Sequence, residues 1–348
     1  MGCAERAGAV GGLAPALFVS HAGSRALQSH SRRWHSCRGR SHRQHSTIDP
    51  PRSIPRVLGM HNHVSLLTDY GLGDEFVGVV KSVIVDLAPH VRITDITHGI
   101  AAFDVRAGSL ALARAIQYVP AGIVIAVVDP GVGSERRAIA VEVAGGRGIL
   151  LGPDNGLLAP ATAMAGGAER AFVLSNTDLH LEAPGATFAG RDVFAPVAAH
   201  LCNGGVLDDV GEEIDTALVM PGIVPVASRE THPRHGEGLR CEVTWVDTFG
   251  NCQLNAGSED IESFGSQLRL VIPGGTEEAV RSARIATHFA AIGDGAVGLV
   301  IDSYGMLAVA VDRGSAAAQL SLGAGDAVLL FAGEDRGPDA PVTLRTTR

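Results

Sequence analysis

Residues 127–139 read VVDPGVGSERRAI, and this stretch indicates both the class of fold and the place to look for chemistry. An apolar run, 123–128, ends at Asp129, and a Pro-Gly-Val-Gly turn and Ser-Glu-Arg-Arg precede the next apolar run. Near-continuous apolar runs are typical of parallel strands that are buried on both faces. The pattern predicts such a strand with a carboxylate at its carboxyl end, where open α/β sheets bind their ligands.

The segments around this strand alternate between strand and helix patterns. Apolar spacing predicts a helix over 74–87, Asp104 is placed to cap a helix that runs to about Tyr118, and a last helix is expected from about Arg191 to Cys202. Strands are expected at 64–68, 91–97, 123–128, 138–143 and 149–151. This order is typical of an N-terminal α/β domain with a mainly parallel sheet, which we place at 63–205.

The pattern changes after residue 205. Residues 206–237 are rich in acids, Pro, Gly and His, and we interpret them as a linker. Short apolar strands punctuated by Gly and Pro follow at 240–247, 267–272, 296–302, 306–312 and 326–331, with no helical pattern between them. The sequence therefore predicts a C-terminal all-β, barrel-like domain over 238–333 and a tail over 334–348.

Composition excludes several classes of partner and cofactor. A formal net charge of −9 argues against nucleic acid or an anionic membrane as the main partner, and no apolar run approaches the ~20 residues of a membrane span. The five cysteines include no C-x-x-C pair, and no H-x-x-x-H, D-x-D or complete phosphate-binding loop is present. We expect a cytoplasmic protein without disulfides, bound metal or cofactor.

Residues 1–60 differ from the rest of the chain. They carry nine Arg, no Lys and only two acidic residues, and they show no helix or strand periodicity. Such a composition is typical of disorder. We interpret the segment as a disordered extension, either a non-native one that precedes Met60 or an organelle-targeting peptide.

Polar residues follow three apolar runs of the N-terminal domain. They are Asp69, His98 and Asp129. Taken singly, an aspartate before a glycine turn most often forms the turn or caps a helix, and a lone histidine is most often structural. Three such residues on successive strands favour a ligand site, because these strand ends meet at one edge of the sheet.

Six stretches, in the same order, resemble one known family. They are LLTDYGLGDEFVGVVK (66–81), ITDITHGIAAFDVRAGS (93–109), VVDPGVGSERRAIAVE (127–142), LGPDNGLL (151–158), TFAGRDVFAPVAAHL (187–201) and VDTFGNCQLN (246–255). The chain resembles the S-adenosyl-L-methionine (SAM) hydroxide adenosyltransferases, or SAM hydrolases, which share a superfamily with SAM-dependent fluorinases and chlorinases. The resemblance spans about residues 63–333. It implies an α/β domain joined to a β-barrel, and a homotrimer that binds SAM between the N-domain of one subunit and the C-domain of the next, without metal.

The resemblance also implies which nucleophile attacks C5′ of the SAM ribose. Halogenases of the superfamily have an aromatic residue where this chain has Asp129, and they lack the Glu-Arg-Arg that follows. Asp129 and Arg136 therefore imply water as the nucleophile and adenosine and L-methionine as products. Asp129 can accept a proton from the water, and Arg136 can orient that carboxylate through a forked contact. Arg137 is expected to face solvent, since neighbours in an extended strand point opposite ways.

The chain departs from the family at Ala189. The hydrolases complete an Asp-Arg-His triad with a histidine in a TFHGRD-like segment, where this chain reads TFAGRD. Three interpretations follow. Asp129 and Arg136 act alone and more slowly; another histidine substitutes, with His98 the candidate; or the protein uses a different nucleophile or has lost activity.

Seven further residues match positions that bind SAM in that family: Asp69, Asp74, Phe103, Asp247, Phe249, Asn251 and Ser303. The resemblance implies that Asp69 holds the ribose hydroxyls and that Asp74 and Asp247 lie near the methionine ammonium. It places Phe103 at the ribose, Phe249 and Asn251 at the adenine, and Ser303 at the methionine, although Tyr304 stands where some members have arginine. Core packing is the alternative interpretation of the two phenylalanines.

The favoured function is therefore hydrolysis of SAM. Two alternatives remain from the sequence. One is a sensor that binds SAM or adenosine without turnover, which Ala189 motivates, and the other is a SAM-dependent halogenase, which Asp129 disfavours.

Overall fold

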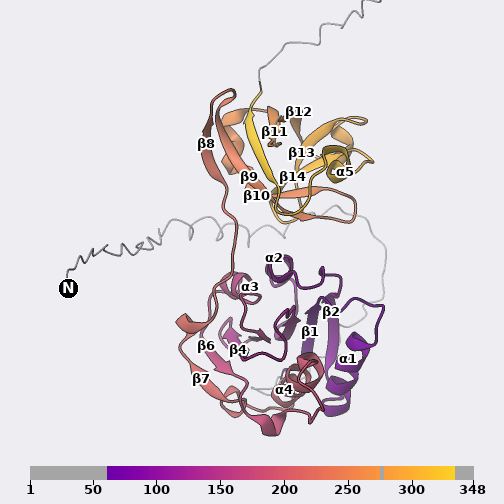
Figure 1. Ribbon diagram of the computed structural model, residues 1–348, viewed down its shortest axis with the longest axis vertical. Helices are drawn as coiled ribbons and strands as arrows, with labels where there is room; N and C mark the ends of the chain where they lie inside the picture. Colours follow the sequence, from indigo (N-terminus) through magenta and orange to yellow (C-terminus); the bar gives the residue numbers. More distant parts are fainter. Residues whose placement is uncertain (1–60, 275–277, 334–348) are drawn as a thin grey trace, which may run out of the picture. The chain divides into compact units, whose positions relative to one another are not determined.

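The computed structural model describes residues 61–274 and 278–333, and Figure 1 shows their helices and strands. The expectations for residues 1–60 and 334–348 lie outside the described residues. Seven strands form the first sheet: β1 (His63–Thr68), β2 (Arg92–Thr97), β3 (Gly122–Val127), β4 (Ala138–Val143), β5 (Gly148–Pro153), β6 (Arg170–Val173) and β7 (Glu212–Ile214). Their order is β2-β1-β3-β5-β4-β6-β7. The strands β2, β1, β3 and β5 run parallel, and β4, β6 and β7 pair antiparallel, so the sheet is mixed.

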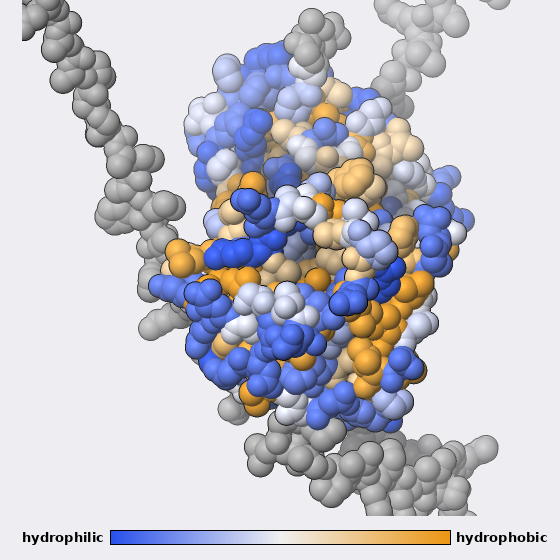
Figure 2. Space-filling model, turned by 60° about the horizontal axis from the view of Figure 1, so that its bottom comes forward, coloured by the Kyte–Doolittle hydropathy of each residue, from blue (hydrophilic) through white to orange (hydrophobic). Residues whose placement is uncertain are grey.

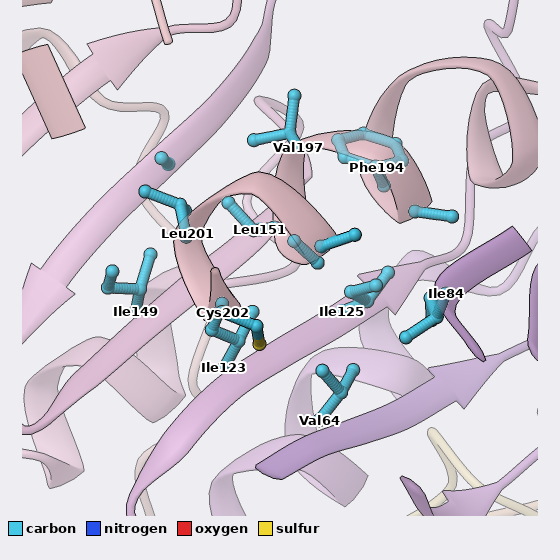
Figure 3. Packing of buried hydrophobic residues seen from close by; sticks show 14 of the residues in the cluster. Val64, Ile84, Ile123, Ile125, Ile149, Leu151, Phe194, Val197, Leu201 and Cys202 are labelled. Atoms are coloured by element: carbon cyan, nitrogen blue, oxygen red, sulfur yellow. The ribbon is translucent and has the colours of Figure 1, made fainter. Parts of the chain in front are cut away.

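Four helices cover this sheet: α1 (Phe76–Leu87), α2 (Val105–Ala115), α3 (Ala159–Met164) and α4 (Ala195–Cys202). All six residues of β3 are buried, as its apolar run predicts. Ile123 and Ile125 pack in one core with α1 and α4, as Figure 3 shows, whereas Val124 packs in a second core with Leu112 of α2. Alternate residues of β3 therefore serve two cores, one on each face of the sheet.

Helix boundaries follow local chemistry. Asp104 Oδ1 accepts a hydrogen bond from the Ala107 N–H at 2.8 Å, which confirms the predicted cap, and α2 ends at Ala115 rather than near Tyr118. The helix expected from Arg191 to Cys202 is one π-helical turn, η2 (Gly190–Phe194), followed by α4. Single π turns are frequent at functional sites.

Eight strands form the second sheet: β8 (Ser228–His232), β9 (Gly236–Val246), β10 (Cys252–Gly257), β11 (Gln267–Ile272), β12 (Ala279–Ala286), β13 (Val297–Ile301), β14 (Met306–Val311) and β15 (Ala327–Ala332). The order is β10-β14-β13-β12-β11-β15-β9-β8, and β10 also pairs with β9. Seven strands therefore close a barrel, and β8 pairs with β9 outside the ring. The expected all-β domain is confirmed, although the short helix α5 (Ala316–Leu320) was not expected, and β7 and β8 lie within the predicted linker.

The surface is mixed in polarity. Figure 2 shows hydrophobic side chains gathered in patches among hydrophilic ones. The segment between β7 and β8 exposes five large apolar residues: Leu218, Met220, Ile223, Val224 and Val226. Exposed apolar stretches of this kind are typical of interaction surfaces. Within 61–274 and 278–333, no helix combines the length and the apolar character that a bilayer crossing requires.

Candidate active site

The candidate site begins just after β3, where Asp129 and Arg136 form an ion pair. Arg136 Nη2 contacts Asp129 Oδ1, and the two side chains are only 19% and 9% exposed. The Gly131 N–H donates to the same carboxylate oxygen at 3.1 Å, so the turn fixes the carboxylate. Burial lowers the pKa of Arg136. The structure thus brings together the two residues that the sequence singled out.

Gly131 lets the guanidinium of Arg136 lie against the turn. A Cβ at this position would overlap Nη1 of Arg136 and would lie 3.1 Å from Cζ and 3.3 Å from Nη2. Real Cβ atoms essentially never make contacts below 3.0 Å, so a side chain here would displace the guanidinium. The glycine is required by this close approach of side chain to backbone.

A cavity of about 300 Å³ opens at the ion pair. Its wall comes from the turn after β3 and from a second segment between residues 180 and 194. The second segment contributes His180, Ala189 and Asp192, with Ala189 half-buried. Ala189 therefore lies at the cavity that holds Asp129 and Arg136, as the family resemblance implies for its position.

His180 is the residue of this cavity that sequence reasoning missed. Its Nε2 is buried and has no hydrogen-bond partner among the described residues, and Nε of Arg136 is buried and unpartnered in the same way. Burial lowers the pKa of His180 from its ordinary value of 6.5. The available signal was its place in the chain, since it lies in the same irregular segment as Ala189 and only nine residues earlier.

The expectation that Arg137 faces solvent is wrong, because its guanidinium pairs with the buried carboxylate of Asp154. Its Nε donates to Asp154 Oδ2 at 2.9 Å, and its Nη2 donates to the Leu218 carbonyl at 2.6 Å. Asp154 is only 4% exposed in its side chain and also accepts from the Met220 N–H at 2.7 Å. Residues 131–137 are irregular rather than extended, so the alternation of a strand does not apply to them.

His98 lies outside this cavity, among the residues at the ends of β1 and β2. Its Nδ1 is 2.9 Å from the Thr68 hydroxyl, and its Nε2 is 3.2 Å from Asp95 Oδ1, at ion-pair distance but outside hydrogen-bond geometry. The side chain is 3% exposed. Asp95 also accepts a hydrogen bond from Lys81 at 2.7 Å. The geometry indicates that His98 braces the loop after β1, and its catalytic role stays a prediction.

Asp69 and Phe103 meet beside β1. Asp69 Oδ2 accepts a hydrogen bond from the Phe103 N–H at 2.9 Å. Phe103 has a φ of 69°, in the left-handed region, and its side chain is 70% exposed. Strained backbone of this kind persists only where surrounding contacts hold it, and it concentrates at functional sites. This exposure excludes core packing for the Phe103 ring. Asp74, the other predicted residue of this region, is exposed and makes no hydrogen bond or ion pair with another described residue.

A second cavity, of about 1040 Å³, lies in the barrel domain and contains the other four predicted residues: Asp247, Phe249, Asn251 and Ser303. Asp247 Oδ1 accepts from the backbone N–H groups of Phe249 and Asn251 at 2.9 and 2.8 Å, and Oδ2 accepts from Asn251 Nδ2 at 2.7 Å. Phe249 is 78% exposed, which excludes core packing for its ring. Asp247 thus organises the β9–β10 loop and presents an aromatic ring to solvent.

One group of side chains in the barrel has the composition of a metal site. His232 and His235 place their Nε2 atoms 3.0 and 3.2 Å from the two oxygens of Glu278. Arg234 contributes an N–H that donates to His232 Nδ1 and a guanidinium 3.0 Å from Glu278. Because Nδ1 accepts, the neutral His232 ring carries its proton on Nε2 and donates it to the carboxylate, whereas a metal would need the lone pair there. The group is a hydrogen-bonded triad, and the expectation of a metal-free protein stays a prediction.

Comparison with known families decides the identity of the chain. The sequence model of the SAM hydroxide adenosyltransferase N-terminal domain matches residues 64–211, and that of the C-terminal domain matches residues 241–329. This chain belongs to the SAM hydroxide adenosyltransferase family. The two matches coincide with the mixed sheet and with the barrel.

Relatives within the SAM hydroxide adenosyltransferase family carry informative names. The (R)-S-adenosyl-L-methionine hydrolase of Salinispora arenicola is 42% identical over 270 residues, 78% of this chain and 98% of its own length. The enzyme of that name from Thermus thermophilus is 38% identical over 276 residues, 77% of this chain and 99% of its own length. A fluorinase from an Actinoplanes species is more distant, at 29% identity over 61% of this chain and 78% of its own length.

A solved structure confirms the fold of this member of the family. A crystal structure of an uncharacterised conserved protein from Thermotoga maritima superposes with a TM-score of 0.66 at 33% identity. The superposition covers 77% of this chain and 99% of that one. The predicted site residues of this family member therefore lie on a shared framework, with Asp129 and Arg136 in one cavity and Asp247, Phe249, Asn251 and Ser303 in another.

Proposed function

We propose that this protein hydrolyses SAM by attack of water on ribose C5′, giving adenosine and L-methionine. The observation that carries the proposal is the buried Asp129–Arg136 pair at a cavity after β3. Aspartate offers a proton acceptor, whereas a halogenase would need a pocket that accepts a halide. The two relatives named (R)-S-adenosyl-L-methionine hydrolase support the same reaction.

The proposed step needs alignment more than activation of the leaving group. The oxygen of water forms a bond to C5′ while the C5′–S bond breaks. The electron pair of the C5′–S bond stays on sulfur, so the sulfonium becomes the neutral thioether of methionine. Asp129 takes a proton from the water, and Arg136 holds the carboxylate in line. Positioning of two reacting groups in this way accounts for a large part of many enzymatic accelerations. The sulfonium already carries the positive charge that a metal would otherwise supply, so we propose a metal-independent reaction without a cofactor.

The remaining predicted residues would bind the substrate. We propose that Asp69 accepts hydrogen bonds from the ribose hydroxyls, while Phe103, whose N–H donates to the same carboxylate, covers the sugar. Asp74 is exposed and unpaired, which suits an ammonium partner. Asp247 can share that role through lone pairs that its loop does not use. Phe249 presents an exposed ring for stacking on adenine, with Asn251 beside it, and Ser303 contacts the methionine.

We also propose a homotrimer whose sites are completed between subunits. Two observations support it. Asp129 and Arg136 line a cavity of the α/β domain whereas Asp247, Phe249, Asn251 and Ser303 line a cavity of the barrel, and the segment from Leu218 to Val226 exposes five large apolar side chains. A cytoplasmic location is proposed as well, because Cys202, Cys241 and Cys252 are free thiols. Sedimentation of the purified protein tests the trimer directly.

The reaction is tested in water labelled with ¹⁸O. Purified protein is incubated with SAM, adenosine and methionine are separated by chromatography, and their masses are determined by mass spectrometry. We expect adenosine that carries ¹⁸O at its 5′ oxygen, and a loss of about 10²–10⁴-fold in kcat for Asp129→Asn, the usual contribution of a general base. Absence of adenosine above the uncatalysed control would refute hydrolysis. Binding of SAM in calorimetry without turnover would instead indicate the sensor that Ala189 motivates, and 5′-halo-adenosine in added halide would indicate a halogenase.

A further inference from the structure

The cavity beside Asp129 contains more polar groups than its ion pair uses. Two buried nitrogen atoms, Nε2 of His180 and Nε of Arg136, have no hydrogen-bond partner among the described residues. Both residues line the same cavity of about 300 Å³. Buried polar atoms are rarely left unpaired in folded proteins, because the unpaired state is costly. The lining of this cavity therefore includes two residues that each hold an unsatisfied nitrogen.

The backbone around His180 is held in place. The His180 N–H donates to the Thr177 carbonyl at 3.0 Å, and the Leu181 N–H donates to the Asp192 carbonyl at 2.9 Å. Asp192 belongs to the π-helical turn η2, which begins just after Ala189. These bonds tie the backbone at His180 to η1 (Thr177–Leu179) and η2, so the position of the residue at the cavity is fixed by its main chain.

We propose that His180 hydrogen-bonds the attacking water together with Asp129 and is the catalytic imidazole of this enzyme. The proposal rests on the function proposed above. Water that binds between the carboxylate and the imidazole is oriented by both, so that a lone pair of its oxygen faces C5′. As the C5′–O bond forms and the C5′–S bond breaks, one proton of the water passes to Asp129 or His180 and from there to solvent. The overall change releases adenosine, methionine and one proton.

Ala189 makes this assignment specific to the present chain. Its methyl group cannot exchange a proton, and it lies on the same cavity wall as His180. His98, the alternative, does not line this cavity: its Nδ1 is 2.9 Å from the Thr68 hydroxyl and its Nε2 is 3.2 Å from Asp95. Of the histidines in the described part of the chain, His180 is the one that lines the cavity with Asp129.

The charge state of His180 suits a proton acceptor. Burial lowers its pKa below the ordinary 6.5, so the ring is neutral at pH 7. The charged groups that line the same cavity are Asp129, Arg136, Arg137 and Asp192, of which Arg136 is paired with Asp129, and Asp192 with Arg191. We expect the imidazole of His180 to give the acidic limb of the pH profile, below pH 6.5.

Four variants test the proposal: His180→Ala, His180→Gln, the double variant His180→Ala with Ala189→His, and His200→Gln. We expect a loss of about 10²-fold in kcat for His180→Ala. His180→Gln, which keeps a hydrogen bond but does not titrate, should retain more activity and lose the acidic limb of its kcat profile. The double variant, which moves the imidazole to the other position on the same wall, should recover activity. His200 pairs with Asp209 and does not line the cavity, so His200→Gln controls for loss of a histidine.

The outcomes separate this proposal from the function on which it rests. If the wild-type protein yields no adenosine, hydrolysis itself fails. If the wild type is active and both His180 variants keep its kcat and its acidic limb, the function stands and the role of His180 is refuted. Thermal unfolding of each variant shows whether it is folded. A folded His180→Gln with an unchanged pH profile is decisive against the proposal even if His180→Ala fails to fold.

Discussion

Replacement of Gly131 by alanine should remove most of the turnover without removing any polar group. The new Cβ would overlap Nη1 of Arg136 and lie 3.1 Å from Cζ, so the guanidinium must move away from the turn. The carboxylate of Asp129 then loses its partner, while its hydrogen bond from the residue 131 N–H remains. The glycine has no positive φ, so the backbone itself accepts alanine.

The magnitude follows from this displacement. A misplacement of about 1 Å at a reacting centre can cost about 10²-fold in rate, or about 2.7 kcal/mol at 1.36 kcal/mol for each tenfold. The cost in stability is small, because the atoms that the new Cβ meets are the far end of a flexible side chain. We therefore expect kcat to fall about 100-fold, with a small decrease in Tm and a preserved circular dichroism spectrum.

The assay compares Gly131→Ala with Gly78→Ala by release of adenosine from SAM. Gly78 lies in α1, and a Cβ there meets nothing within 4 Å, so the same methyl group enters open space. Alanine in a helix interior is about 0.5–1 kcal/mol better than glycine, so this control should keep its kcat and show a slightly higher Tm. A Gly131→Ala protein with the kcat of the wild type would show that the position of the Arg136 guanidinium does not limit the reaction.

Three further predictions concern stability and reactivity. Asp154→Asn should lower the free energy of unfolding in urea by about 2 kcal/mol. Breaking a fully buried ion pair costs ~3–5 kcal/mol, and the cost is lower here because the Arg137 side chain is 36% exposed. An unchanged urea midpoint would contradict this. Burial raises the pKa of Cys202 and Cys241 to about 12 and that of Cys252 to about 11, so iodoacetamide at pH 8 should modify these three only after unfolding, as peptide mass spectrometry would show; rapid labelling of the native protein would disprove it. Burial acts to raise the pKa of Glu278, but hydrogen bonds from two histidines and a nearby arginine lower this pKa overall. The Glu278 carboxylate therefore contributes to stability above pH 4.5, and this contribution is lost as the pH falls through the lowered pKa. Glu278→Gln should therefore lower Tm at pH 7, with a gap to the wild type that closes in acid; a gap independent of pH would refute it.

Elements with strong periodicity could be predicted from the sequence, and short polar ones could not. β3 and α1 carry long apolar patterns, because each buries a continuous face. β7 and β8 are short and largely exposed, so no apolar pattern distinguishes them from a linker. α5 has five residues, most of them alanine, and it forms because Ser315 caps it through a hydrogen bond from the Ala318 N–H.

The candidate site could be predicted where its residues follow strands. Asp69 and Asp129 directly follow buried apolar strands. Asp129 pairs with Arg136 across the turn that the Pro-Gly-Val-Gly segment predicts. His180 could not be found in this way, because it lies in an irregular segment whose path no periodicity indicates. Its place at the cavity that Asp129 lines depends on the hydrogen bonds that tie residues 180 and 181 to Thr177 and Asp192. Arg137 was misjudged for a related reason, since its partners Asp154 and Leu218 are distant in the sequence.

Two arginines joined by one peptide bond hold different carboxylates, Arg136 that of Asp129 and Arg137 that of Asp154. Deletion of a single residue between Asp129 and Arg136 would place Arg137 where Arg136 now pairs with Asp129. Insertion of one residue would place Arg136 where Arg137 now pairs with Asp154. Substitutions in that stretch change one contact, but a change in its length would change both at once. During evolution, this turn should therefore vary in composition at its solvent-facing positions and keep a constant number of residues.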